Sequence, residues 1–164
     1  MRKNVCIAVA VLLLIATCFA GCGTEEGGFR GFGEPFTADV EGEWRGVAFS
    51  AEISGEAAGE GGVQPLTVTF YAPEALCGTV LRRRATGETE LSVGELSLPV
   101  TADFEAFFAM FGADATKGRA SVTEEGMTAI ETDGVRYLLL PDDTLFRIEC
   151  AKGFLNVKRF SAPV

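Results

Sequence analysis

The chain has 164 residues, of which 14 are Lys or Arg and 23 are Asp or Glu, so its formal net charge is −9. This acidic balance argues against a nucleic-acid binder, whose affinity comes mainly from neutralising phosphates. Because the chain contains no histidine, Ser–His and Cys–His catalysis, histidine zinc ligands and imidazole acid–base chemistry are excluded. A content of 48% apolar residues, with 13 Phe, is typical of a folded protein.

Residues 1–21 are predicted to be a lipoprotein signal peptide. Arg2 and Lys3 precede an uninterrupted apolar run over residues 5–16, and small residues stand immediately before Cys22. The run is too short for a spanning helix, which needs about 20 apolar residues. The Ala-Gly-Cys ending resembles the lipobox of bacterial lipoproteins, in which the cysteine becomes an N-terminal diacylglyceryl-cysteine carrying acyl chains such as palmitate.

Cys22 is therefore the predicted lipidation site, and the membrane is the predicted partner. The expected location is the extracytoplasmic face of the cell membrane or envelope, where acyl chains hold a soluble domain at the bilayer. In the alternative interpretation, Cys22 is an ordinary thiol after conventional cleavage or next to an uncleaved anchor.

Residues 22–35 are predicted to be a flexible, acylated tether. Residues 23–34 contain five glycines and three glutamates, a composition that cannot bury a core. Phe29 and Phe32 are unusual in this stretch. They either contact the headgroup region or fold back on the domain.

Residues 36–164 are predicted to form one domain, which begins with β-strands. Apolar side chains alternate from Phe36 to Trp44, and after a turn at Arg45-Gly46 they continue over 47–53 as the second arm of a hairpin. Further strands are expected at 66–70 and 78–84. Residues 89–98 are expected to form two short strands broken at Gly94.

A helix is predicted over residues 102–111, because four phenylalanines share one helical face there. Thr101 or Asp103 can cap its start and Gly112 can end it. This aromatic face needs an apolar partner, and the sheet is the available one. The four residues are Phe104, Phe107, Phe108 and Phe111.

Five more strands are expected between residues 120 and 160, joined by hairpin turns such as Asp133-Gly134 and Lys152-Gly153. The predicted fold is mainly antiparallel β, of the α+β kind. We expect a half-open β-barrel or strongly curved meander sheet of about nine or ten strands with one covering helix.

The stretch FTADVEGEWRGVAFSAEIS…LTVTFYAPEALCGTVLRRR, with its turn at residues 71–78 and the aromatic helix that follows, resembles the LolA-like lipoproteins of bacteria. These are related in fold to the outer-membrane lipoprotein carrier and sorting proteins. The resemblance covers residues 36–160 and implies a half-open barrel whose concave side is covered by a helix. It also implies binding of a lipid or acyl chain, but it assigns no individual residue to that role.

Cys77 and Cys150 are the cysteines left after Cys6, Cys18 and Cys22 are assigned to the export segment. Outside the cytoplasm they form a candidate disulfide. Each also lies in an apolar strand context, in which a free cysteine packs as a small hydrophobic residue. Both interpretations remain open at this stage.

The sequence contains no calcium-loop spacing, nucleophile elbow or phosphate-binding glycine loop. No catalytic residue, metal ligand or cofactor is therefore predicted. The run Arg82-Arg83-Arg84 is expected at a hairpin tip with side chains on alternating faces, although contact with anionic lipid headgroups is a second interpretation.

Two functions follow from these sequence features. In the first, a non-enzymatic lipoprotein holds a lipid or another hydrophobic ligand between its curved sheet and helix. The four helix phenylalanines would form the lid, and Trp44, Phe49 and Phe70 would form the walls. In the second, the same rings complete the core of an envelope structural or protein-interaction domain without a small ligand.

Overall fold

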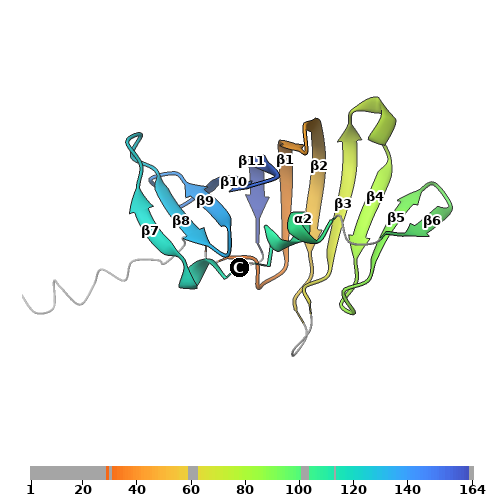
Figure 1. The fold of residues 1–164 in the computed structure, drawn as a ribbon, viewed down its shortest axis with the longest axis horizontal. Coiled ribbons are helices and arrows are strands. Elements are labelled where there is room, and N and C mark those ends of the chain that lie inside the picture. The colour runs from red at the N-terminus through yellow and green to blue at the C-terminus, as the bar shows by residue number, and fades with distance from the viewer. Residues whose placement is uncertain (1–28, 30, 59–62, 101–103, 113, 163–164) are drawn as a thin grey trace, which may run out of the picture.

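The computed structural model describes residues 29, 31–58, 63–100, 104–112 and 114–162. In these ranges the chain forms one antiparallel sheet of eleven strands in the order β6-β5-β4-β3-β2-β1-β11-β10-β9-β8-β7. For the described residues, the predicted fold class, a curved and unclosed meander sheet with one helix, is confirmed (Figure 1). The observed number of eleven strands exceeds the estimate of about nine or ten, although each strand corresponds to a segment expected from the sequence.

The first half of the sheet contains six strands in chain order. They are β1 (Phe36–Trp44), β2 (Val47–Gly55), β3 (Leu66–Ala72), β4 (Thr79–Arg83), β5 (Thr89–Val93) and β6 (Leu96–Pro99). The β1–β2 turn is tight because Arg45 and Gly46 both have positive φ values, 51° and 82°, a combination typical of two-residue hairpin turns. A short 3₁₀ turn, η1 (Glu74–Leu76), connects β3 to β4.

The second half follows the helix α2 (Glu105–Ala109) and the 3₁₀ turn η2 (Ala115–Lys117). It contains β7 (Arg119–Val122), β8 (Thr128–Thr132), β9 (Val135–Leu139), β10 (Leu145–Cys150) and β11 (Gly153–Ser161). The predicted helix was longer, over 102–111. Its first residues lie outside the described ranges, and after Ala109 the chain tightens into a turn in which the Phe111 N–H donates to the Phe108 carbonyl (3.0 Å).

The two halves join where β1 pairs with β11 in the middle of the sheet. The strands approach closely at Gly153, where an added Cβ would lie 2.0 Å from the Glu43 carbonyl oxygen. Register shifts at Asp39/Val40 in β1 and at Ser50/Ala51 in β2 interrupt the ladders. Such bulges bend a strand and increase its twist, which helps to curve the sheet around the helix.

The concave face of the sheet carries the core. Inward residues of β1–β4 and β9–β11 form one buried cluster with those of the helix segment. The residues at 2% exposure or less include Ile53, Val68, Leu81, Tyr137 and Leu155. The core cluster extends from Phe32 to Leu155. The chain without residues 1–21 therefore retains the whole of this cluster.

Candidate functional site

The aromatic residues expected to form a lid and walls lie together on the concave face. The Phe107 ring is 5.3 Å from the Trp44 ring of β1 and 6.2 Å from the Phe49 ring of β2. Phe49 in turn lies 5.5 Å from Phe70 of β3. Phe107 also contacts both of the helix-side rings that follow it, Phe108 and Phe111 (5.8 and 5.7 Å).

These rings fill the space between helix and sheet. Phe107, Phe108 and Phe111 are each at most 2% exposed, and Phe49 and Phe70 are also buried. The helical face with Phe104, Phe107, Phe108 and Phe111 is called the aromatic stripe. Its middle is therefore core, as expected for the second function considered from the sequence, a domain without a small ligand. Open space borders the stripe at its two ends, beside Phe104 and beside Phe111.

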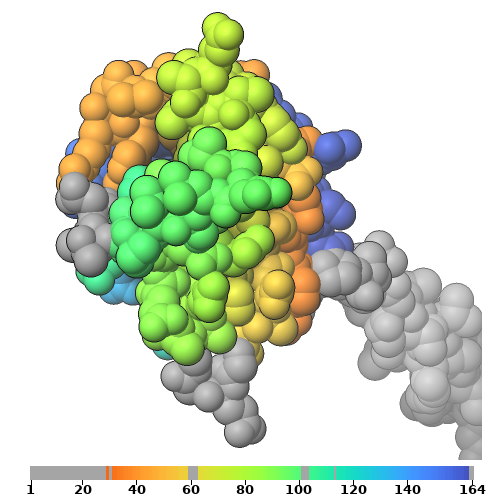
Figure 2. Space-filling view, turned by 90° about the vertical axis from the view of Figure 1, so that its right-hand side faces the viewer, coloured from red at the N-terminus to blue at the C-terminus, as the bar shows by residue number. Residues whose placement is uncertain are grey.

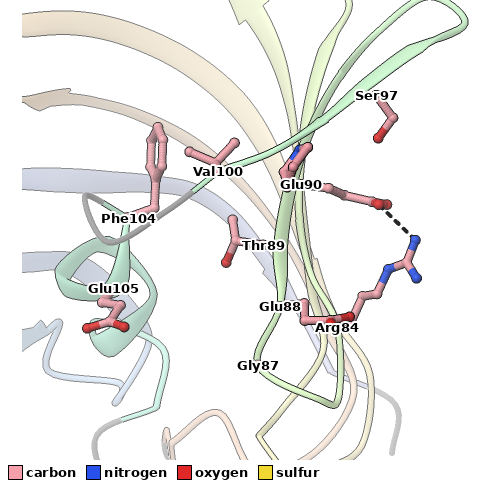
Figure 3. A pocket seen from close by; sticks show the side chains of 10 residues that line it. Arg84, Gly87, Glu88, Thr89, Glu90, Ser97, Val100, Phe104 and Glu105 are labelled. Atoms are coloured by element: carbon pink, nitrogen blue, oxygen red, sulfur yellow. Dashed lines mark hydrogen bonds and ion pairs between the residues drawn. The ribbon is translucent and has the colours of Figure 1, made fainter.

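The first cavity, next to Phe104, has a volume of about 590 Å³. Phe104 and Val100 line it on one side of β5, whereas Arg84 and its ion-pair partner Glu90 lie on the other side (Figure 3). The cavity thus extends around the β5–β6 end of the sheet, and its lining mixes apolar and charged groups. In the space-filling view from this side, the β5–β6 segment lies at the front of the molecule (Figure 2).

The second cavity, next to Phe111, has a volume of about 460 Å³. Its apolar walls come from Phe32, Ala58, Val63 and Phe111. Its polar lining comes from three side chains, those of Gln64, Arg83 and Asp114. Apolar walls with a few convergent polar groups are typical of small-molecule sites, and the volume falls within the usual range of about 300–1,000 Å³.

Arg83 is the cation of this second cavity. The register that places buried Leu81 opposite Val68 also places Arg83 opposite Leu66, on the concave face. Its guanidinium carbon lies 4.8 Å from the centroid of the Phe108 ring, and its Nε donates to the Gln64 carbonyl oxygen (3.2 Å). Burial lowers the pKa of the Arg83 guanidinium below its ordinary value, since desolvation disfavours the charged form.

Phe29 and Phe32 fold back on the domain, the second of the alternatives considered from the sequence. Phe32 is 4% exposed. Its ring lies 4.7 Å from Phe36, 5.1 Å from Phe111 and 5.1 Å from Phe29. These two residues were missing from the predicted site. The sequence signal that could have identified them is the presence of two phenylalanines in a glycine-rich stretch with few other apolar side chains.

Cys77 and Cys150 are both free thiols in the structure, so the candidate disulfide is not formed. The reason is their separation. Cys77 follows β3 and Cys150 ends β10, and these strands lie four positions apart in the sheet. Four strand spacings amount to about 19 Å, whereas bridged cysteines have Cα atoms about 4.4–6.8 Å apart.

The remaining features to be placed are the lipidation site, groups that could bind a metal, and helices that could cross a membrane. Cys22 lies outside the described residues, so the structure does not test its lipidation. Within the part of the chain that the structure describes, no group of three or more His, Cys, Asp and Glu side chains is placed to hold a metal ion. No helix among the described residues has the length and hydropathy needed to cross a membrane.

The chain was compared with family models, curated proteins and solved structures. No protein-family model matches the chain, and no curated protein matches it either. A similar solved structure is that of an uncharacterized conserved protein from Thermus thermophilus, which is 14% identical, with a TM-score of 0.46 over 80% of each chain.

Two further similar structures carry more descriptive names. A putative outer membrane lipoprotein-sorting protein domain from Vibrio parahaemolyticus is 7% identical, with a TM-score of 0.48 over 80% of this chain and 86% of that chain. The LolA superfamily protein NE2245 from Nitrosomonas europaea is 6% identical, with a TM-score of 0.39 over 80% and 87%. The resemblance to LolA-like proteins expected from the sequence is thus found again as a likeness of fold. Sequence identities of 6% and 7% give no information about a ligand.

Proposed function

We propose that this protein is a non-enzymatic lipoprotein of the bacterial envelope that binds a hydrophobic ligand in the second cavity. The observation that carries this function is the apolar wall formed by Phe32, Val63 and Phe111 around a space of about 460 Å³. The predicted space beneath Phe107 and Phe108 is filled by their own rings. Space remains at both ends of the stripe. The ligand is assigned to the Phe111 end because apolar side chains form its wall, whereas the first cavity is lined by the charged residues Arg84, Glu88, Glu90 and Glu105.

The proposed acyl anchor at Cys22 keeps this cavity close to a bilayer. Phe29 contacts Phe32, which lines the cavity, at a ring distance of 5.1 Å. Phe29 is seven positions after Cys22, and a chain of that length spans at most about 25 Å. A ligand that leaves the membrane near the anchor would therefore have a short path to the cavity.

The anchor itself has a direct test. Replacing Cys22 by Ala removes the acylated thiol, so we expect the protein to move from the membrane fraction to the soluble fraction, because lipid chains contribute about 0.8 kcal/mol per buried methylene. Fractionation and labelling with a radioactive fatty acid measure this outcome. A Cys22→Ala protein that still sediments with membranes and still incorporates label would contradict the proposed anchor.

Ligand binding is tested by native mass spectrometry of the chain expressed without residues 1–21 and purified without detergent. We expect co-purified lipid on the wild-type chain, and its loss in Val63→Asp, because the substitution places a carboxylate in the apolar wall of the cavity. Val63 is 40% exposed, so the carboxylate is tolerated by the fold. Val122→Asp is the matched control, since Val122 is 77% exposed on β7 at the far edge of the sheet.

A second function is favoured by a separate observation at the other end of the sheet. Val93, Leu96 and Leu98 are exposed. They share a face with Leu91, which pairs with buried Leu81, so they lie on the concave side of β5 and β6. The helix α2 lies away from these two strands (Figure 1). Because β6 is an edge strand, this surface suits a protein-interaction domain. A bare mass for the wild-type chain in the native experiment would favour this function over ligand binding.

A further inference from the structure

Three consecutive arginines lie at the end of β4, the last of them just after the strand, and their side chains have different surroundings. Arg82 and Arg84 both form ion pairs with Glu90, at 3.2 Å and 2.7 Å. Arg83 points to the opposite face, into the second cavity, because successive strand residues alternate between faces. Within the described ranges, no carboxylate lies within ion-pair distance of its guanidinium. Arg83 is thus a partly buried cation without an anionic partner among the described residues.

Among the residues that the structure describes, Arg83 has one hydrogen-bond acceptor. The guanidinium has five N–H donors, and Nε is engaged by the Gln64 carbonyl oxygen (3.2 Å). The guanidinium also lies over the ring of Phe108, with its central carbon 4.8 Å from the ring centroid. The two terminal nitrogens retain the geometry that binds a carboxylate or phosphate through two parallel hydrogen bonds.

The other charged side chain of the cavity does not compete for Arg83. Asp114 accepts hydrogen bonds from the backbone N–H of Thr116 (3.0 Å) and from its hydroxyl, and it pairs with Lys117 Nζ (2.9 Å). The hydrogen bonds from Thr116 lower the pKa of the Asp114 carboxyl, with a further contribution from Lys117. Its charge is therefore balanced within η2 and does not offset the charge of Arg83.

We propose that the second cavity binds an amphiphile with a single apolar tail and an anionic head, and that Arg83 binds the head. The tail would lie against Phe32, Val63 and Phe111, and a carboxylate or phosphate would meet the terminal nitrogens of Arg83. This inference rests on the proposed function, since it names the class of hydrophobic ligand. Arg83 then acts as a specificity-determining residue that distinguishes an anionic amphiphile from a neutral one.

The test compares probes that each have a ten-carbon chain, counting the carboxylate carbon of decanoate, and that differ in their heads. Decanoate, decyl phosphate and decan-1-ol are titrated by calorimetry, below their aggregation limits, into the chain without residues 1–21, which retains the whole core cluster. We expect the wild-type chain to bind decanoate or decyl phosphate about tenfold more tightly than decan-1-ol. The tighter of the two anions identifies the head as a carboxylate or a phosphate.

Variants assign this preference to Arg83. Arg83→Met is expected to lose the roughly tenfold preference, so that the anionic probes bind no more tightly than decan-1-ol does. Arg83→Lys keeps the charge and is expected to retain part of the preference. Arg82→Met is the matched control, because Arg82 lies on the opposite face and pairs with Glu90. It should leave the binding of all three probes unchanged.

Different results would contradict the role of Arg83 and the proposed function. Equal binding of decanoate, decyl phosphate and decan-1-ol to the wild-type chain would overturn the role of Arg83 but not the binding of a hydrophobic ligand in the cavity. This comparison needs no variant, so it can be made even if Arg83→Met does not fold. Equal weakening of all three probes in Arg83→Met would likewise assign Arg83 a structural role only. Inorganic phosphate that binds as tightly as decyl phosphate, or no binding of any tailed probe, would overturn the proposed function together with this inference.

Discussion

Replacing Phe111 by Ala is expected to lower the free energy of unfolding by about 3–5 kcal/mol, the usual cost of removing a fully buried aromatic ring. Phe111 is 1% exposed. Its ring contacts Phe32, Phe36 and Phe107 at centroid distances of 5.1, 6.1 and 5.7 Å. It therefore joins the helix segment to β1 and to the chain that precedes β1. Urea denaturation of the chain without residues 1–21 measures the effect.

Phe104 is the matched control for Phe111, because both belong to the aromatic stripe expected from the sequence. Phe104 is partly exposed and borders the first cavity. Phe104→Ala is therefore expected to cost about 1 kcal/mol, since less apolar area returns to water. Equal losses of stability in the two variants would show that the stripe is not packed as the structure has it.

Replacing Phe32 by Ala is expected to have an effect of similar size, about 3–5 kcal/mol, although this residue lies in a stretch whose composition predicts a flexible tether. Phe32 packs among the rings of Phe29, Phe36, Phe111 and Phe160 at 4.7–6.0 Å. Its removal leaves a cavity in the aromatic core and loosens the wall of the second cavity. Denaturation midpoints and limited proteolysis near residue 32 report both effects.

The control for Phe32 is a phenylalanine outside the core cluster. Phe146 in β10 is 39% exposed, so Phe146→Ala is expected to cost less than about 1 kcal/mol. A Phe32→Ala chain as stable as the wild type would mean that the segment before β1 does not belong to the folded domain.

The meander itself could be predicted from the sequence because its signals are local. Period-two alternation located β1 and β2, and the Arg45-Gly46 turn between them is formed by positive φ angles that a two-residue hairpin requires. The helical spacing of Phe104, Phe107 and Phe111 likewise located α2. Side chains two positions apart in a strand lie on the same face. The alternation that places Leu81 inward therefore also indicates that Arg83 lies on the inward face.

The second cavity could not be predicted, because its lining comes from segments that lie far apart in the chain. Phe32 precedes β1, Val63 precedes β3, and Phe111 follows α2. Only the strand order, in which β1 pairs with β11 and α2 crosses the concave face, brings these residues together. The burial of Phe32 also opposes the local composition, because tertiary contacts with Phe36 and Phe111 outweigh the flexibility that its glycine neighbours favour.

The location of a bound acyl chain is the most direct measurement of the proposed function. Intermolecular nuclear Overhauser effects between decanoate and the methyl and aromatic protons of the chain without residues 1–21 report that location. We expect contacts from the decanoate tail to Val63, Phe32 and Phe111, the apolar wall of the second cavity. Contacts confined to Leu96 and Leu98 at the β6 edge, with none to the rings of Phe32 and Phe111, would contradict the assignment.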